Sequence, residues 1–197
     1  MSTTKTKSGS TIDDLLAHPD RKHLELVDGL LIDRALGEQG AVAAGYLMSA
    51  LWNYNGSTRA GWLFASTLAF RCFPNRDRVR HVSMSYVKRS RLPVLGNEFF
   101  STIVPDLIVE MTPPYLNPDE VPARIDDFLA AGTPLVWVAN YEKQIILVRR
   151  PGEPDLILRD SDTLIGGDVL PGFSVPVSEL FPPMVESFRS PSKQCQS

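Results

Sequence analysis

Short apolar runs separated by turn residues mark the beginning of the folded chain. Residues 23–33, HLELVDGLLID, contain two such runs, and Asp28-Gly29 lies between them. This dipeptide tolerates positive φ angles and is therefore a strong signal for a two-residue hairpin turn. The pattern predicts an N-terminal β-hairpin.

Two longer segments have the spacing of amphipathic helices. In residues 37–55, apolar side chains recur every three or four positions, and the run ends near Asn55-Gly56. Residues 118–131 repeat the pattern on one side and end at Gly132, a residue typical of helix C-termini. We therefore expect two main helices.

The remaining apolar segments resemble strands. Residues 61–73 and 78–87 predict an antiparallel pair, and the continuous apolar run at 102–111 predicts a central strand covered on both faces. Three further strands are expected at 135–140, 144–150 and 155–160, before a wrapping segment at 166–181 that ends in one helical turn. The predicted class is α/β (α+β), a mixed sheet flanked by the two helices.

Composition places these elements in one domain. The chain has 197 residues, of which 43% are hydrophobic and 22% charged, as is usual for a globular protein. We expect a single domain over residues 12–185, with mobile polar tails at 1–11 and 186–197. No apolar run is long enough for a membrane span or a signal peptide, so a cytoplasmic location and no membrane partner are expected. Two cysteines, Cys72 and Cys195, provide neither a disulfide framework nor a thiolate zinc site.

Charge is unevenly distributed along the chain. The net charge is −3, yet residues 71–91 contain seven basic residues and a single acid, Asp77. This stretch either keeps a strand edge soluble or forms an electrostatic footprint for a polyanion. The residues that would contact nucleic acid are Arg71, Arg78, Arg80, Lys88, Arg89 and Arg91.

Carboxylates are the main candidates for chemistry. The sequence has no glycine-rich phosphate loop, no histidine pair at metal spacing and no nucleophile elbow. Asp106 and Glu110, however, lie in the predicted central strand, where charge requires an explanation. They are either functional, since oxygen ligands favour magnesium, or Asp106 caps the entry to the strand and Glu110 lies beyond its buried part.

Five motifs, in this order, resemble one family. They are HLELVDGLLID at 23–33, PDLIVEM at 105–111, FLAAG at 128–132, LVWVAN at 135–140 and GGDVLPGFSVPVSELF at 166–181. Together they resemble the Uma-type restriction endonucleases of the PD-(D/E)XK nuclease superfamily, over about residues 20–182. The resemblance implies a restriction-endonuclease-like core, DNA as the substrate or ligand, and a Mg²⁺ or Mn²⁺ ion held by carboxylates while a lysine positions the attacking water.

The residues that the resemblance assigns to the site are acidic, with one arginine. Glu25 and Asp28 match the family's opening hairpin, and Asp106 and Glu110 match its Pro-Asp-x-x-x-Glu strand. Arg124 lies at the position of the family's helical lysine. The expected metal ligands are Glu110, Asp106 and Glu25, and these three with Arg124 are the expected catalytic residues.

Other positions depart from the family pattern. Val82-Ser83 stands where Pro-Asp is usual, Gln39 replaces a histidine, and Thr112 stands where a Glu-x-Lys motif would have lysine. Arg124 could bind phosphate, but with a pKa above about 12 it is a poor proton shuttle. Along an extended strand the backbones of Asp106 and Glu110 would lie roughly 13 Å apart, too far to share one ion without a neighbouring strand.

Three hypotheses follow. The first is a Mg²⁺-dependent endonuclease with a degraded site, in which Glu110 with Asp106 or Glu25 holds the ion. The second is an inactive module of the same fold that binds nucleic acid or a protein partner. The third is action through a homodimer. Trp52, Trp62 and Trp137 are expected in the core, where they would not stack on bases.

Overall fold

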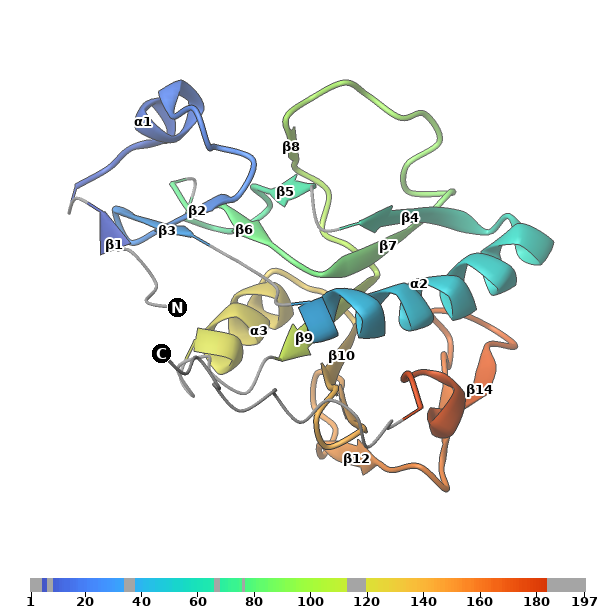
Figure 1. Ribbon diagram of the computed structural model, residues 1–197. Helices are drawn as coiled ribbons and strands as arrows, with labels where there is room; N and C mark the ends of the chain where they lie inside the picture. Colours follow the sequence, from blue (N-terminus) through green and yellow to red (C-terminus); the bar gives the residue numbers. More distant parts are fainter. Residues whose placement is uncertain are drawn as a thin grey trace, which may run out of the picture.

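A six-stranded mixed sheet forms the centre of the computed structural model (Figure 1). The structure describes residues 5–6, 9–33, 38–65, 68–75, 77–112 and 120–183. In spatial order the strands are β12 (Leu156–Leu158), β11 (Ile145–Arg149), β10 (Leu135–Asn140), β9 (Leu107–Thr112), β7 (Met84–Lys88) and β4 (Gly61–Ala65). The β9 and β10 strands are parallel, and the other neighbours are antiparallel. The predicted mixed sheet is confirmed.

The two predicted helices cover opposite faces of this sheet. Alternation along β9 directs Val109 and Met111 into a core with α2 (Glu38–Thr58), whereas Ile108 packs against α3 (Glu120–Ala130). Both central strands are buried on both sides, as the continuous apolar runs predicted.

The C-terminal part of the described chain wraps around the sheet face that α2 covers. It comprises β13 (Thr163–Ile165), β14 (Ser174–Pro176) and a final 3-10 turn, η1 (Val177–Glu179). Its buried residues Leu170, Phe173 and Leu180 join the α2 core, so the predicted wrapping segment with one helical turn is confirmed. The expected tail at 186–197, including Cys195, lies outside the described residues.

A second, smaller assembly holds the hairpin. The turn residues Asp28 and Gly29 have φ angles of 50° and 75°, as the two-residue turn between the hairpin strands requires. The strands β2 (Leu24–Val27) and β3 (Leu30–Asp33) form the hairpin; β1 (Lys5–Thr6) pairs with β3, and α1 (Ile12–Ala17) precedes it. Lys5 and Thr6 fall within the segment expected as an N-terminal tail.

The predicted pair 61–73 and 78–87 divides between two sheets. Its outer halves pair as β4 and β7, but its inner halves, β5 (Ala69–Phe70) and β6 (Arg80–His81), form a separate sheet. The third strand of that sheet is β8 (Phe100–Ser101), from a later part of the chain. A bridge between Leu26 and Val79 joins the hairpin to this small sheet. As a result, β2 lies beside Arg80 and His81.

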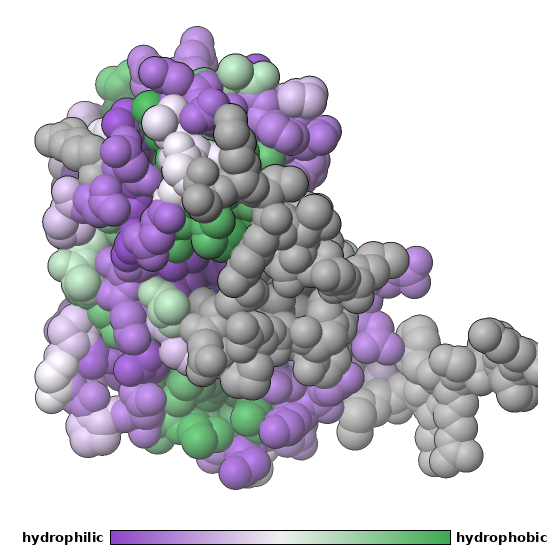
Figure 2. All heavy atoms as spheres, turned by 90° about the vertical axis from the view of Figure 1, so that its left-hand side faces the viewer, coloured by the Kyte–Doolittle hydropathy of each residue, from purple (hydrophilic) through white to green (hydrophobic). Residues whose placement is uncertain are grey.

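The tryptophans do not share one environment. Trp137 is fully buried and Trp62 is half-buried, but Trp52 on α2 is 63% exposed, so the prediction that all three lie in the core is wrong for Trp52. Figure 2 shows the side of the molecule at the left of Figure 1, where hydrophobic residues reach the surface in separate areas among hydrophilic ones. No helix in the described parts of the chain has the length and apolarity needed to cross a membrane.

Gly61 is the position where β4 approaches β7 most closely. A Cβ atom there would lie 2.4 Å from the Tyr86 ring and 2.4 Å from the Val87 carbonyl oxygen. We expect Gly61→Ala to lower the free energy of unfolding by about 1–3 kcal/mol, because the buried ring and the strand must shift. Gly56→Ala is the matched control, since its Cβ would meet nothing within 4 Å. Urea unfolding of both variants measures the difference, and an equal stability of the two would contradict this packing.

Candidate functional site

Glu25 is a fully buried carboxylate on β2. Its neighbours Leu24 and Leu26 pack with Leu15 in the hairpin core, so strand alternation directs Glu25 to the opposite face. There it accepts hydrogen bonds from the backbone N–H of His81 at 2.9 Å and from Arg80 Nη1 at 3.2 Å. The bridge between Leu26 and Val79 therefore positions the first two donors for Glu25.

Glu110 is a second fully buried carboxylate, on β9. Because it alternates with Val109 and Met111, it lies on the sheet face that α3 covers. Its Oε1 accepts a hydrogen bond from Arg124 Nη1 at 2.9 Å. A charged group buried in this way needs a partner of opposite charge.

Arg124 is that partner for both carboxylates. It lies on α3 beside Ile125, which packs into the core, and only 3% of Arg124 is exposed. Besides Glu110, its guanidinium contacts both oxygens of Glu25, through Nε and Nη2 at 3.2 Å each. The planar, five-donor guanidinium suits such two-sided pairing. One cationic side chain thus joins the hairpin, the central sheet and α3.

An outer layer of ion pairs surrounds this centre. Arg80 donates from Nε to Asp127 at 2.8 Å, and Arg78 pairs with both Asp127 and Asp28. Burial by itself lowers the pKa of Arg78, but its hydrogen bonds and proximity to Asp28 and Asp127 raise that pKa above its ordinary value. Together with Arg124, three arginines meet four carboxylates, so positive charge here is internally balanced.

Comparison with known proteins agrees with this arrangement of hairpin, sheet and helices. The family model Uma2, described as "Putative restriction endonuclease", matches residues 12–178. The chain belongs to the Uma2 family.

A solved structure gives the same fold. It is described as a "putative nuclease" from Anabaena variabilis, and it matches with a TM-score of 0.74 at 19% identity, over 87% of this chain and 97% of the other. Among curated proteins, none matches this sequence. The restriction-endonuclease-like fold predicted from the motifs is therefore confirmed.

Asp106 has different hydrogen-bond and ion-pair partners from the two buried glutamates. Its Oδ2 accepts from the backbone N–H of Lys88 at 2.9 Å, its Oδ1 pairs with Arg91 at 2.9 Å, and its own N–H donates to Tyr86. It thus caps the pairing of β7 with β9, which is the structural alternative considered from the sequence. From the sequence we expected Asp106 to join Glu25 and Glu110 in one site. In the structure its carboxylate instead contacts the Lys88 N–H and Arg91 at the end of β7.

Ser83 stands where the family resemblance placed an aspartate. The register pairs Met84 with Val109, so the next position brings Ser83 beside Glu110, and its hydroxyl accepts from the Met111 N–H at 3.0 Å. Only 5% of Ser83 is exposed. The position is right for a second carboxylate next to Glu110, but the residue supplies a neutral oxygen already used by the backbone.

These residues do not fit the divalent ion that the resemblance implies. Magnesium prefers an octahedral set of oxygens and retains several waters. Glu25 and Glu110 are instead joined by a guanidinium, and within the described ranges no three acidic, histidine or cysteine side chains gather as a metal-binding group. The alternative that Glu110 lies beyond the buried part of its strand is also wrong, since Glu110 is fully buried.

Three of the seven cations in the basic stretch at 71–91 form ion pairs within the described parts of the protein. Arg78, Arg80 and Arg91 pair with carboxylates, as described above. Lys88 Nζ donates to the Asp168 carbonyl at 3.1 Å, and the Arg89 guanidinium lies 4.4 Å from the centre of the Trp62 ring. Arg71 is half-buried, and Arg76 lies outside the described residues. Most of these cations therefore have structural partners, contrary to a simple exposed footprint.

Sequence reasoning did not identify Asp127. It lies three residues after Arg124, on the same side of α3, and pairs with Arg80 in the outer layer. The i,i+3 spacing of an arginine and an aspartate on a predicted helix was the available signal. It could not indicate that the partner of Asp127 would come from a strand more than forty residues away in the chain.

Removing Arg124 should lower the free energy of unfolding more than removing an arginine that pairs at the surface. Arg124→Met leaves Glu25 and Glu110 buried without their shared partner, and we expect unfolding free energy to fall by about 3–5 kcal/mol. Arg149→Met is the control, because Arg149 pairs with the exposed Asp126 and Asp155 and should change stability by less than about 1 kcal/mol. Chemical denaturation followed by circular dichroism compares them. Similar small losses in both would show that the buried network does not stabilise the fold.

Proposed function

We propose that this Uma2-family protein is a binding protein built on the nuclease fold, that it does not hydrolyse phosphodiester bonds, and that its partner is a protein. One observation carries the proposal: the Arg124 guanidinium contacts both oxygens of Glu25 and one oxygen of Glu110. The two acids that the family resemblance assigns to metal binding are thereby paired with a permanent cation of the chain itself.

Hydrolysis requires groups that this centre does not provide. A metal-assisted reaction needs carboxylate oxygens open to an ion and a bound water that becomes the nucleophile. Here Ser83 offers no charge, and Arg124 holds its protons too strongly to act as a general base. Exchanging Arg124 for an ion would also remove the direct contact between Glu25 of the hairpin and α3. The balance of these effects favours a structural role for the network.

The choice of a protein partner follows from the charges. Binding to a nucleic-acid backbone depends on basic side chains that are available to phosphates. In this protein three arginines of the basic stretch contact carboxylates, Lys88 donates to a carbonyl group, and Arg89 lies over an aromatic ring. We therefore propose that a protein partner binds to a surface other than the basic stretch.

A plasmid-nicking assay tests the absence of cleavage. With Mg²⁺ or Mn²⁺ we expect equal, background nicking by the wild-type protein and by Glu110→Gln, which keeps an acceptor for Arg124. Nicking by the wild type that Glu110→Gln abolishes would overturn the proposal and assign Glu110 to a metal-dependent reaction.

A restoration variant makes this test sharper. Ser83→Asp with Arg124→Lys creates a carboxylate beside Glu110 and frees part of the space between the two glutamates. We expect Mn²⁺ to raise the melting temperature of this variant but not of the wild type, because a ligand that binds only the folded state stabilises it. Ser57→Asp with Arg149→Lys makes the same two kinds of substitution at the exposed Ser57 and the half-buried Arg149, and is the control. If Mn²⁺ raised the melting temperature of the wild type as much as that of the variant, the argument that the wild-type centre does not fit a divalent ion would be wrong.

DNA binding is tested separately. Most of the described cations of the basic stretch have partners within the protein. We therefore expect mobility-shift titrations with duplex DNA to show no binding even at low salt, where phosphate contacts are strongest. Salt-sensitive binding that Arg89→Gln weakens would return nucleic acid as the partner, since phosphate contacts give this salt dependence.

A further inference from the structure

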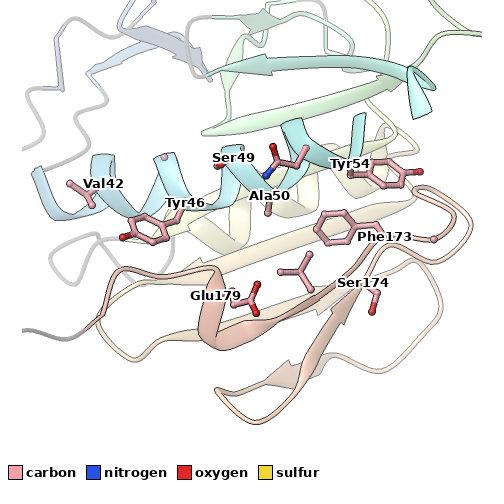
Figure 3. Close-up of a pocket in the computed structure, with 12 residues that line it drawn as sticks. Val42, Tyr46, Ser49, Ala50, Tyr54, Phe173, Ser174 and Glu179 are labelled. Atoms are coloured by element: carbon pink, nitrogen blue, oxygen red, sulfur yellow. The ribbon is translucent and has the colours of Figure 1, made fainter. Parts of the chain in front are cut away.

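A groove lies between α2 and the C-terminal segment, on the sheet face opposite Glu110 and α3. Its volume is about 710 Å³, which is within the range of sites for small organic molecules. Figure 3 shows its two walls: Tyr46 and Ser49 belong to α2, and Phe173, Ser174 and Glu179 belong to the C-terminal segment. The groove is thus separate from the Arg124 network.

The two walls are held together by Tyr54. Its hydroxyl donates to the Pro171 carbonyl at 3.1 Å, and its ring packs edge-on against Phe173. Phe173 in turn packs against the fully buried Trp137 of the central sheet, with 5.3 Å between the ring centres. A groove that is formed before a ligand arrives loses less conformational entropy on binding.

Several polar side chains of the lining are not used by the fold. Within the described parts of the chain, no hydrogen bond or ion pair engages the side chains of Tyr46, Ser49, Asn53, Ser174 and Glu179. The first three are spaced by three and four residues along α2, so they form one row on the helical wall. Ligand sites combine apolar walls with a few polar groups of this kind.

The charge of the lining is one-sided. Among the described residues that line the groove, Glu179 alone is charged, and residues 39–58 of α2 contain no aspartate, glutamate, lysine or arginine. An anionic ligand would meet the Glu179 carboxylate and no basic group. A cation would be attracted by that carboxylate, and the faces of the Tyr46 and Phe173 rings also favour positive charge.

We infer that the groove binds a small organic cation, a molecule that carries an amine on an apolar body. The ammonium group donates to Glu179, which accepts hydrogen bonds only while it is ionised and has no competing cation of the chain beside it. The apolar body packs between Ala50 of the uncharged helical wall and Phe173. Ser49 and Asn53 then distinguish ligands by the hydrogen bonds that they offer.

The inference goes beyond the proposed function and does not depend on it. The proposal of a non-cleaving protein rests on Arg124 and the α3 face, whereas this site uses residues of α2 and the C-terminal segment. Cleavage is measured by nicking and the groove by ligand titration, so failure of one does not imply failure of the other.

Three probes with one apolar body test the charge preference: phenylpropylamine, phenylpropanol and phenylpropionate. Each is titrated into the full chain, and amide NMR spectra report both the affinity and the location of binding. We expect the amine to bind with a Kd on the order of 1 mM, as is usual for a ligand of this size. It should shift the Ser49 and Ser174 signals and bind about tenfold more tightly than the alcohol, through the ion pair and the ring faces. The acid should not bind.

Glu179→Gln tests the residue that selects the cation. It keeps the size of the side chain and removes its charge, so the preference for the amine over the alcohol should fall below about threefold while the affinity for the alcohol stays unchanged. Glu142→Gln is the matched control, because Glu142 is exposed in the turn between β10 and β11 and does not line the groove. It should keep the tenfold preference.

Gly45→Leu tests the groove itself. Gly45 lines the groove, and a Cβ atom there would meet nothing within 4 Å, so the new side chain fills space without disturbing the fold. We expect both the amine and the alcohol to bind at least about tenfold more weakly, since ligand and side chain cannot occupy the same volume. Gly56→Leu is the control on the same helix, where a Cβ atom is equally free of contacts and lies outside the groove.

Three results would overturn the inference. One is equal binding of the amine and the alcohol to the wild type. Another is a preference for the amine that Glu179→Gln leaves intact, which would assign the cation to a different carboxylate. The third is a set of shifted amide signals that excludes the groove residues and is the same in Gly45→Leu.

Discussion

A buried carboxylate must be paired, and this constraint governs how the parts of the protein are joined. Glu25 comes from the hairpin and Glu110 from the central sheet, and both would be strongly disfavoured inside the fold as isolated charges. Arg124 from α3 pairs with both. The ion-pair centre therefore joins the hairpin to the sheet and to α3, which themselves pack through a shared apolar core.

The same centre is the basis of the proposal that this protein does not carry out nuclease chemistry. In a metal-dependent site, carboxylates remain open to an ion and to water. Here the cation is part of the chain, and a neutral serine lies beside Glu110. A covalently attached guanidinium cannot be exchanged or lost. Family membership follows from the motifs and fold, whereas activity depends on these few positions.

The distribution of charge has a second consequence, at the surface. Arginines that lie close together in the sequence are used to join the hairpin, small sheet and α3 from within, and α2 remains uncharged on the outside. A surface without charge has little electrostatic preference among partners, but it favours one that is also neutral and apolar.

The sequence determined the elements, because apolar periodicity and turn chemistry are local properties. The Asp28-Gly29 turn, both long helices and the buried central strands were predictable from a few neighbouring residues each. The order of the motifs was also sufficient to indicate the family. The absence of charge in residues 39–58 is visible in the sequence, but amphipathic spacing alone led to the wrong expectation for Trp52.

Only the tertiary structure decided what the charged residues do. Asp106 and Glu110 lie in one short motif, yet the first caps a strand edge and the second is buried beneath α3. Glu25 and Arg124 are 99 residues apart, and their contact depends on a bridge between the hairpin and the small sheet. Such pairings are set by how separate elements pack together, and no local pattern of residues contains that information.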